Sequence, residues 1–421
     1  MLLGVDVGGT FTDAVLVAGG AIHTAKAPTT PDDQSRGVMD AVRAVLDRAG
    51  AQEGDVALFA HGMTVATNAL LEGRGARTAF VATEGFADVV ELGRQARRDL
   101  YRLCAAWPAP FAPPERRFGA PERIGPEGVL RALEDPGAVA AAVAGCAPEA
   151  VAVCLLHAYR DPAHELALGE ALRERLGAHV HVSLSHEVVG TFREFERAAT
   201  TEVDAALSPL VGAYLHALAD RAREAGLPEP RIMQSSGGLA TLEVAADHAA
   251  LTVLSGPAGG AAAAALVSAA AGEPDLLCFD MGGTSCDVSV VEEGAVREAA
   301  GRDVGGRPLA LPMIDIHTVG AGGGSIGWRD AGGALRVGPR SAGAEPGPAC
   351  YGRGGTEPTV TDANLVLGLL DPGAPLAGEL GLSTEDCAGG FVRVANAEMV
   401  RAMRVMTVEQ GLDPRDFALL A

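Results

Sequence analysis

Two short stretches of this 421-residue sequence place aspartate, glycine and threonine in the same pattern. The first is GVDVGGTFTD (4–13), and the second is FDMGGTSCDV, which begins at residue 279. Asp6 aligns with Asp280, so the offset between the copies is 280 − 6 = 274 residues. In each copy a Gly-Gly-Thr turn joins two predicted strands, and such a turn offers backbone N–H groups and a hydroxyl to phosphate oxygens. A carboxylate at a strand end suits Mg²⁺, which takes few carboxylates and keeps much of its hydration.

This repeat predicts one nucleotide site built from both copies. A single Gly-Gly turn closes many hairpins for conformational reasons alone, but two copies that share five positions are harder to explain in that way. The predicted catalytic residues and magnesium ligands are Asp6 and Asp280. The predicted phosphate contacts are Gly8, Gly9, Thr10, Gly282, Gly283 and Thr284. Thr12, Asp13 and Asp287 are second-rank candidates, because a strand aspartate can also cap the neighbouring turn.

The residues around the first copy predict the elements that position it. Alternating apolar residues indicate strands at LLGVDV, DAVLVA and AIHTAKA, and a helix follows from about residue 32 to 48. Strand VALFAH, helix VATNALLEGR and strand RTAFVAT come next, which is the order of a ribonuclease H-like sheet. We therefore predict an α/β fold in which two ribonuclease H-like lobes face a nucleotide cleft. The predicted lobes are residues 1–272, with a sub-boundary near 190, and residues 273–421.

Composition excludes several classes of protein. The formal net charge of −21 disfavours nucleic acid and anionic membranes as partners. Seven scattered cysteines without a CxxC pair indicate neither a disulfide framework nor a zinc site, and with the lack of a secretory leader they favour the cytoplasm. Lys26 is the only lysine and does not follow a glycine-rich loop, so a Walker A phosphate loop is excluded.

A second glycine-rich segment, GGGSIG (322–327), matches both the dinucleotide pattern and the nucleophile elbow. Both motifs need a following helix, whereas WRDAGGALRVG predicts a turn and a strand. We interpret Gly322, Gly323 and Gly324 as a flexible loop that lines the cleft and contacts the cofactor. Asp315 and His317 would then lie near the substrate, with a hydrogen-bonded structural role as the alternative for His317.

Other polar clusters were weighed in the same way. His61, Thr64 and Asn68 lie where a strand meets a helix, which predicts either a substrate site or an N-cap cluster. His179, His181 and His186 are interpreted as a solvated edge, because no carboxylate or cysteine completes a metal site. The segment REFER (193–197) is interpreted as a solvated helix face with charges at helical spacing.

The two aspartate–glycine hairpins resemble the phosphate motifs of the actin and sugar kinase superfamily, which includes the heat-shock ATPases. Longer motifs resemble the hydantoinase A / oxoprolinase family over nearly the whole chain. These motifs are HGMTVATNALLEGRGARTAFVATEGFADVVELGRQ (61–95), DIHTVGAGGGSI (315–326), and GAEPGPACYGRGG with PTVTDANLVLG (343–368). That family also contains the ATP-binding subunits of acetone and acetophenone carboxylases.

The resemblance implies an ATP- and Mg²⁺-dependent hydrolase subunit that activates the carbonyl of a cyclic amide, of the 5-oxoproline or hydantoin type. It also implies a hydantoinase B-type partner subunit and a homo- or hetero-oligomer. The alternatives are an ATP-dependent ketone carboxylase subunit and a non-catalytic or truncated nucleotide-binding paralogue. Family members continue beyond a strand like FALLA into a GGAGP turn that resembles an adenosine-binding motif, so we expect an incomplete second lobe and weak nucleotide affinity for the 421 residues.

Overall fold

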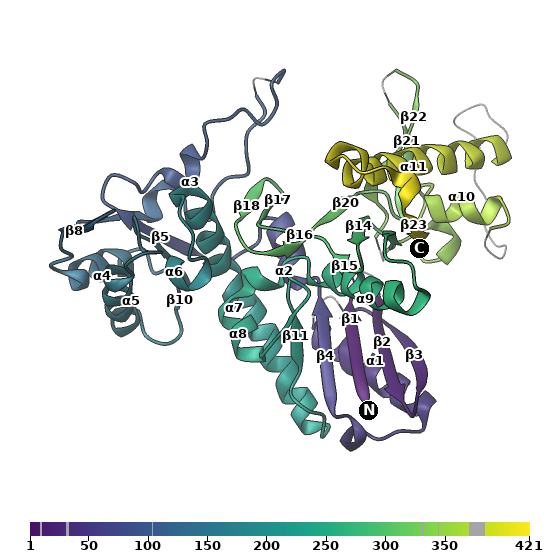
Figure 1. Ribbon diagram of the computed structural model, residues 1–421, viewed down its shortest axis with the longest axis horizontal. Coiled ribbons are helices and arrows are strands. Elements are labelled where there is room, and N and C mark those ends of the chain that lie inside the picture. The colour runs from purple at the N-terminus through teal and green to yellow at the C-terminus, as the bar shows by residue number, and fades with distance from the viewer. Residues whose placement is uncertain (9–10, 31–32, 103, 331, 344, 370–383) are drawn as a thin grey trace.

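The computed structural model of the chain describes residues 1–421 except 9–10, 31–32, 103, 331, 344 and 370–383 (Figure 1). Its first sheet has six strands in the order β12-β11-β4-β1-β2-β3. β1, β2 and β3 are antiparallel neighbours, whereas β4 and β11 extend the sheet in parallel. The predicted ribonuclease H-like order is confirmed as far as β4, but the strand predicted at RTAFVAT belongs to another sheet and β11 takes its place. The strands are β1 (Leu2–Val7), β2 (Phe11–Ala18), β3 (Ala21–Pro28), β4 (Leu58–Met63), β11 (Arg231–Met233) and β12 (Leu239–Ala240).

Helix α1 (Gln34–Ala49) covers one face of this sheet. The Asp33 carboxylate accepts the N–H of Ser35 at 3.2 Å and caps the start of the helix, while Gly50 ends it in the left-handed conformation. Alternate residues of β1, such as Val5, are buried against apolar residues of α1, such as Val42.

The second sheet repeats this arrangement with later segments. β13 (Leu276–Met281) pairs antiparallel with β14 (Cys286–Glu292) and parallel with β23 (Ala418–Leu420). β14 also pairs with β20 (Ile316–Val319) and with β15 (Ala295–Val296). The order β20-β14-β13-β23 therefore corresponds to β3-β2-β1-β4, and α11 (Thr384–Met406) packs on β14 and β20. The prediction that the second hairpin unit repeats the first is confirmed.

A third sheet is wholly parallel and lies at the left of Figure 1, apart from the other two. Its strands, in the order β10-β9-β5-β6, are β5 (Thr78–Thr83), β6 (Arg117–Ala120), β9 (Ala150–Cys154) and β10 (His181–Leu184). β5 and β9 are buried along their whole length, as is typical of a parallel sheet covered on both faces. The covering helices on one face are α4 (Pro136–Ala144) and α5 (Ala163–Leu176).

The long helix α7 (Glu194–Glu224) covers the other face of the third sheet and continues to the first. Ala198 and Ala205 pack on the third sheet, whereas Leu218 packs with the core of the first. One helix thus packs on both sheets. The predicted lobe boundaries near residues 190 and 272 stay predictions.

Helix α9 (Ser255–Ala271) lies between the first and second sheets in Figure 1. It packs against β4 and β11 of the first sheet and against β13 and β14 of the second. Its buried residues include Ala258, Ala261 and Ala264, whose small side chains let both sheets approach closely. This helix is therefore the shared support for both hairpins.

The remaining elements are short. Helices are α2 (Val65–Leu71), α3 (Val89–Leu92), α6 (Ser185–Val188), α8 (Leu242–Asp247) and α10 (Val360–Val366). Strands are β7 (Arg123–Gly125), β8 (Gly128–Arg131), β16 (Glu298–Ala299), β17 (Arg302–Val304), β18 (Arg307–Leu309), β19 (Met313–Ile314), β21 (Ser325–Arg329) and β22 (Leu335–Ser341). Single turns are η1 (Glu53–Asp55), η2 (Pro114–Arg116), η3 (Ala249–Thr252), η4 (Ala349–Tyr351), η5 (Val408–Gln410) and η6 (Pro414–Asp416). Within the described ranges, no helix combines the length and apolar character needed to cross a membrane.

The interpretation of REFER (193–197) as a solvated face is wrong for Arg197, which is only 1% exposed. Its guanidinium donates to Ser185 Oγ at 3.1 Å, to the Thr191 carbonyl at 2.9 Å and to the Leu155 carbonyl at 2.7 Å. Ser185 in turn donates to the buried carboxylate of Glu165 at 2.6 Å. Burial succeeds because the guanidinium is hydrogen-bonded and a carboxylate lies beyond Ser185.

Candidate functional site

Among the described residues, the two predicted phosphate hairpins share the hydrogen bond that closes the turn and the register of their strands. In the first, the Gly8 N–H donates to the Phe11 carbonyl at 3.0 Å, and in the second the Gly282 N–H donates to the Ser285 carbonyl at 2.9 Å. The strand registers also match, since Asp6 pairs with Asp13 and Asp280 pairs with Asp287. Gly282, Gly283 and Thr284 are exposed, whereas Gly9 and Thr10 lie outside the described residues.

Helix α9 brings the two strand-end aspartates to one place. A Cβ added at Gly256 would lie 3.2 Å from Asp6 Oδ1, and one added at Gly260 would lie 3.7 Å from Asp280 Oδ2. Residues four apart occupy the same helix face, so the two carboxylates lie against successive turns of α9. A Cβ at Gly62 on β4 would come within 2.7 Å of Asp6 Oδ1, so Gly62 also makes room for that carboxylate.

The electrostatics of this place favour a cation. Desolvation by the surrounding protein, and then the negative charges of Asp13 and Asp280, raise the pKa of Asp6 to about 6. Desolvation also raises the pKa of Asp287 to about 6, against a hydrogen bond from Thr318 that lowers it. Carboxylates that repel one another are stabilised as anions by a bound cation, so the donor set fits Mg²⁺. Among the described residues, no three His, Cys, Asp or Glu side chains converge into a complete metal site, so the remaining ligands would be water and phosphate.

Lys26 is a site residue that the sequence analysis missed. Lys26 on β3 is paired in register with Asp13 on β2, and its ammonium lies 2.9 Å from Asp13 Oδ1. The ammonium also lies 5.0 Å from the centre of the Phe11 ring. The only lysine of the chain is therefore beside the first hairpin, and the strand register was the signal that could have placed it.

The second-rank residue Thr12 supports the first turn from inside. Thr12 is fully buried, and its hydroxyl lies 3.3 Å from that of Thr29. Thr29 donates to the Gly8 carbonyl at 2.9 Å. Thr12 thus fixes the turn through Thr29, with no exposed surface of its own.

The glycine-rich loop at 322–324 packs directly behind the second hairpin. The N–H groups of Gly323 and Gly324 donate to the carbonyls of Gly282 and Gly283 at 3.0 and 2.6 Å. A Cβ at Gly322 would collide with the Thr284 backbone at 2.6 Å, so this approach requires glycine. Since Gly322 N–H donates to Ser325 Oγ at 2.8 Å, all three amides are occupied within the protein. β21 follows, so the rejection of the two helix-requiring motifs is confirmed.

Asp315 directly precedes β20, and His317 lies on that strand. His317 pairs in register with Val288 of β14, one residue from Asp287. Arg302 on β17, which the sequence analysis also missed, is half-buried among acidic groups. Desolvation lowers its pKa, while Asp315 and Asp287 raise it. Desolvation and the nearby Arg302 charge lower the pKa of His317, which favours the neutral imidazole.

The segment from His61 to Asn68 is a structural cluster in this conformation. His61 is fully buried, with Nδ1 3.2 Å from the Val5 carbonyl and Nε2 2.7 Å from the Tyr214 hydroxyl. Both ring nitrogens are occupied, so His61 has no atom left for a substrate. Thr64 donates to the Val7 carbonyl at 3.0 Å, and the Asn68 amide lies 3.4 Å from the Thr64 hydroxyl. The structural alternative therefore fits His61 better than the substrate role.

The burial of His61 predicts a pH-dependent stability. Desolvation lowers its pKa from 6.5 to about 4, so the unfolded chain takes up a proton at a higher pH than the folded chain. The stabilisation is present above pH 6.5 and is lost as the pH falls towards 4, by about 3 kcal/mol in total. We expect the difference in unfolding free energy between the parent and His61→Gln, from urea titrations, to shrink over this interval. A difference independent of pH would contradict the burial of a neutral imidazole.

Two mixed sheets of the same ribonuclease H-like order, each carrying a Gly-Gly hairpin beside a strand-end aspartate, define an actin-like α/β protein. Comparison with known families agrees with this class. The hydantoinase/oxoprolinase N-terminal region model matches residues 2–176, and the hydantoinase/oxoprolinase model matches residues 197–374 and 373–421. The chain belongs to the hydantoinase/oxoprolinase family, as the sequence motifs predicted.

Similar proteins include three enzymes. Caprolactamase subunit alpha of Pseudomonas jessenii is 37% identical over 99% of this chain and 64% of its own length. The crystal structure of ATP-dependent caprolactamase from that organism matches with a TM-score of 0.85 at 36% identity, over 100% of this chain and 65% of the other. Acetophenone carboxylase gamma subunit of Aromatoleum aromaticum is 34% identical over 99% of this chain and 62% of its own length. The protein 5-oxoprolinase 1 of Arabidopsis thaliana is 33% identical over 99% of this chain and 38% of its own length. The chain therefore spans less than two thirds of the length of these relatives.

Proposed function

We propose that the chain is part of an ATP-dependent hydrolase that activates the carbonyl of a cyclic amide by phosphoryl transfer. The observation that carries this proposal is the pair of matched hairpins whose aspartates, Asp6 and Asp280, lie against successive turns of α9. The similarity to a caprolactamase subunit and to 5-oxoprolinase supports a lactam as the substrate class.

In this proposal the two hairpins divide the binding of ATP and Mg²⁺. Asp6 and Asp280 hold the ion, which when bound supplies positive charge to the phosphate oxygens. The exposed turn residues Gly283 and Thr284 donate to phosphate in the second hairpin, and Gly9 and Thr10 do so in the first. The N–H groups of Gly8 and Gly282 close their own turns instead, so these two glycines contribute close approach of the backbone and not a donor. Gly322, Gly323 and Gly324 hold the second turn from behind. Lys26 supplies a positive charge beside the first turn.

The second-rank residues orient these groups. Asp13 is paired with Lys26 and lies across from Asp6, so it positions the ammonium and raises the pKa of Asp6. Asp287 accepts a hydrogen bond from Thr318 across β14 and β20. Arg302 interacts electrostatically with Asp287, Asp315 and His317. We assign Asp315, His317 and Arg302 to the substrate approach. Neutral His317 is suited to accept or donate one proton there.

The chemistry requires only positioning and charge neutralisation from the protein. The amide oxygen attacks the terminal phosphorus of ATP, the bond to ADP breaks, and the carbonyl carbon becomes electrophilic. Water then adds to that carbon and the ring C–N bond breaks, which leaves an acyl phosphate. A second water attacks the same carbon and breaks its bond to the phosphate oxygen, so phosphate leaves with the former carbonyl oxygen. The products are ADP, phosphate and a linear amino acid.

A ketone carboxylase subunit is the second candidate, because the acetophenone carboxylase gamma subunit is nearly as similar as the caprolactamase subunit. In that reaction the phosphorylated group is the enol oxygen of a ketone, and bicarbonate is the second substrate. Both relatives are named as subunits, which supports an oligomer. We propose that the partner is a hydantoinase B-type subunit and that the protein works in the cytoplasm.

The test is Mg²⁺-dependent ATP hydrolysis by the complete enzyme, with 5-oxoproline, hydantoin, caprolactam or acetone, each with and without bicarbonate. Stimulation by a cyclic amide without bicarbonate is expected. Stimulation by acetone that requires bicarbonate would favour the carboxylase. No nucleotide binding and no hydrolysis in a folded protein would favour a non-catalytic relative.

Gly62 gives a more local prediction. In Gly62→Ala the new methyl group would displace the Asp6 carboxylate, and a misplacement of about 1 Å costs up to roughly a hundredfold in rate. We expect the kcat of ATP hydrolysis to fall about ten- to a hundredfold, with unchanged circular dichroism. Gly4→Ala on β1 is the matched control, because a Cβ there has no neighbour within 4 Å. Equal activity of the two variants would show that the position of the Asp6 carboxylate does not matter for the reaction.

A further inference from the structure

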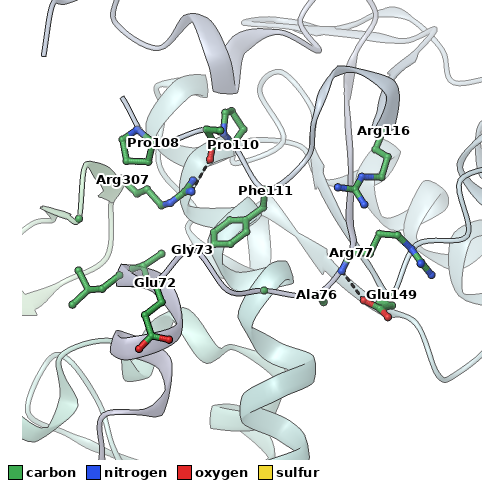
Figure 2. A pocket seen from close by; sticks show the side chains of 15 residues that line it. Glu72, Gly73, Ala76, Arg77, Pro108, Pro110, Phe111, Arg116, Glu149 and Arg307 are labelled. Atoms are coloured by element: carbon green, nitrogen blue, oxygen red, sulfur yellow. Dashed lines mark hydrogen bonds between the residues drawn. The ribbon is translucent and has the colours of Figure 1, made fainter. Parts of the chain in front are cut away.

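A pocket lies at a junction of three parts of the chain, away from the two hairpins (Figure 2). It is lined by the segment that leaves α2 (70–77), by the proline-rich loop at 108–111, and by the turn between β17 and β18. Arg116 and Glu149 close it on the side of the third sheet. Its cavity volume is about 700 Å³, within the usual range for small-molecule sites.

Two guanidinium groups face the interior from opposite sides in Figure 2. Arg307 is held in place, since it donates to the Ala109 carbonyl at 2.6 Å and its guanidinium lies 4.2 Å from the centre of the Phe111 ring. Arg116 is different, because its buried Nε–H has no hydrogen-bond partner among the described residues. A buried guanidinium N–H without a partner is costly, and an anionic ligand would satisfy it.

The acidic residues of the pocket are already engaged. Glu149 accepts the backbone N–H of Arg77 at 2.7 Å, and Glu72 is paired with Arg74. The Arg77 side chain is turned towards the Ala147 carbonyl, to which its Nε donates at 2.7 Å. The lining therefore holds three arginines against two glutamates, in a chain whose net charge is −21.

Apolar side chains form part of the remaining walls. Pro108, Pro110 and Phe111 form one wall, and Leu70 lies on another. A Cβ at Gly75 would lie 2.9 Å from the Phe111 ring, so the ring packs directly on the backbone there. Such walls bury the apolar body of a ligand and need no rearrangement to do so.

We propose that this pocket binds a small organic carboxylate, with its carboxylate between Arg116 and Arg307 and its apolar body against Phe111 and the two prolines. Planar guanidinium groups pair well with carboxylates, and the flat apolar walls select against a fully hydrated inorganic anion. The pocket is a ligand site separate from the nucleotide hairpins and does not depend on the proposed phosphoryl transfer.

The test is isothermal titration calorimetry of the full chain with hexanoate, hexylammonium and inorganic phosphate, without ATP or Mg²⁺. We expect hexanoate to bind and the other two to bind at least about tenfold more weakly. Arg116→Gln should weaken hexanoate about tenfold or more, which is the scale of one charge-assisted hydrogen bond. Because the Arg116 side chain makes no hydrogen bond within the described residues, this variant should fold normally.

Arg175→Gln, an exposed position at the end of α5, is the matched control and should bind hexanoate like the parent. Arg307→Lys is a second variant, which keeps the charge but loses the planar group over Phe111, and it should also bind more weakly. Undetectable hexanoate binding, equal binding by hexylammonium or phosphate, or unchanged binding by Arg116→Gln would each overturn the proposal. None of these outcomes bears on ATP hydrolysis, so the two proposals fail independently.

Discussion

Asp280→Asn should lower Mg²⁺-dependent ATP hydrolysis by about a thousandfold or more in the complete enzyme. The substitution keeps the shape of the side chain but removes one of the two charges that face α9. Loss of a single preorganised electrostatic group costs about 10²–10³ in kcat, and a lost metal ligand acts on every phosphate oxygen that the ion touches. Asp6→Asn should have a similar effect, because the two strand ends are equivalent by register.

The control for these variants is Asp40→Asn, at an exposed aspartate of α1 that pairs with Arg43. It changes the net charge equally but should retain full activity. Circular dichroism and the urea midpoint separate loss of function from loss of fold. Hydrolysis by Asp280→Asn above about a tenth of the parent rate would mean that the second hairpin does not contribute to the proposed magnesium site.

Arg197→Ala, on α7, should strongly destabilise the packing of that helix on the third sheet. It removes three hydrogen bonds and leaves the Ser185–Glu165 pair without the nearby positive charge. Loss of one partner from a buried charged network costs about 3–5 kcal/mol. The chain contains several sheets that can unfold separately, so the effect is best measured locally, by hydrogen exchange of the β9 and β10 amides. Exchange there should accelerate by about a hundredfold or more.

The matched control is Arg223→Ala on the same helix, where Arg223 forms an exposed pair with Asp220. Exposed pairs contribute about 0–1 kcal/mol, so this variant should change the exchange of β9 and β10 very little. Similar protection in the two variants would mean that the hydrogen bonds of Arg197 contribute no more than a surface pair.

The local pattern predicted the hairpins well. Asp6, Gly8 and their counterparts 274 residues later (280 − 6 = 274) adopt matching registers, because a repeated strand–turn–strand sequence repeats its backbone hydrogen bonds. The antiparallel hairpins β1–β2–β3 of the first sheet followed from alternating apolar residues and short turns, whereas the places of β11 and β12 did not. These features depend on neighbours within a few residues, which sequence periodicity reports directly.

Contacts between distant segments were not predictable in the same way. Arg197 looked solvated because its helical neighbours are charged, yet the tertiary fold turns it towards β9 and Glu165. Lys26 carried no motif, and only the β2–β3 register places it beside Asp13. Gly62 and Gly256 gave no sequence signal either, since their role is to leave space for a carboxylate that is far away in the chain.

Phosphoryl transfer to the amide oxygen is tested most directly with a lactam labelled with ¹⁸O in its carbonyl group, turned over by the complete enzyme with ATP and Mg²⁺. If the carbonyl oxygen attacks phosphorus and water then cleaves the acyl phosphate at carbon, the label leaves with the phosphate, and mass spectrometry should find one ¹⁸O in the inorganic phosphate. If instead water attacks the amide without phosphorylation, the label stays in the carboxylate of the linear product, and that result would contradict the proposed chemistry at the two hairpins.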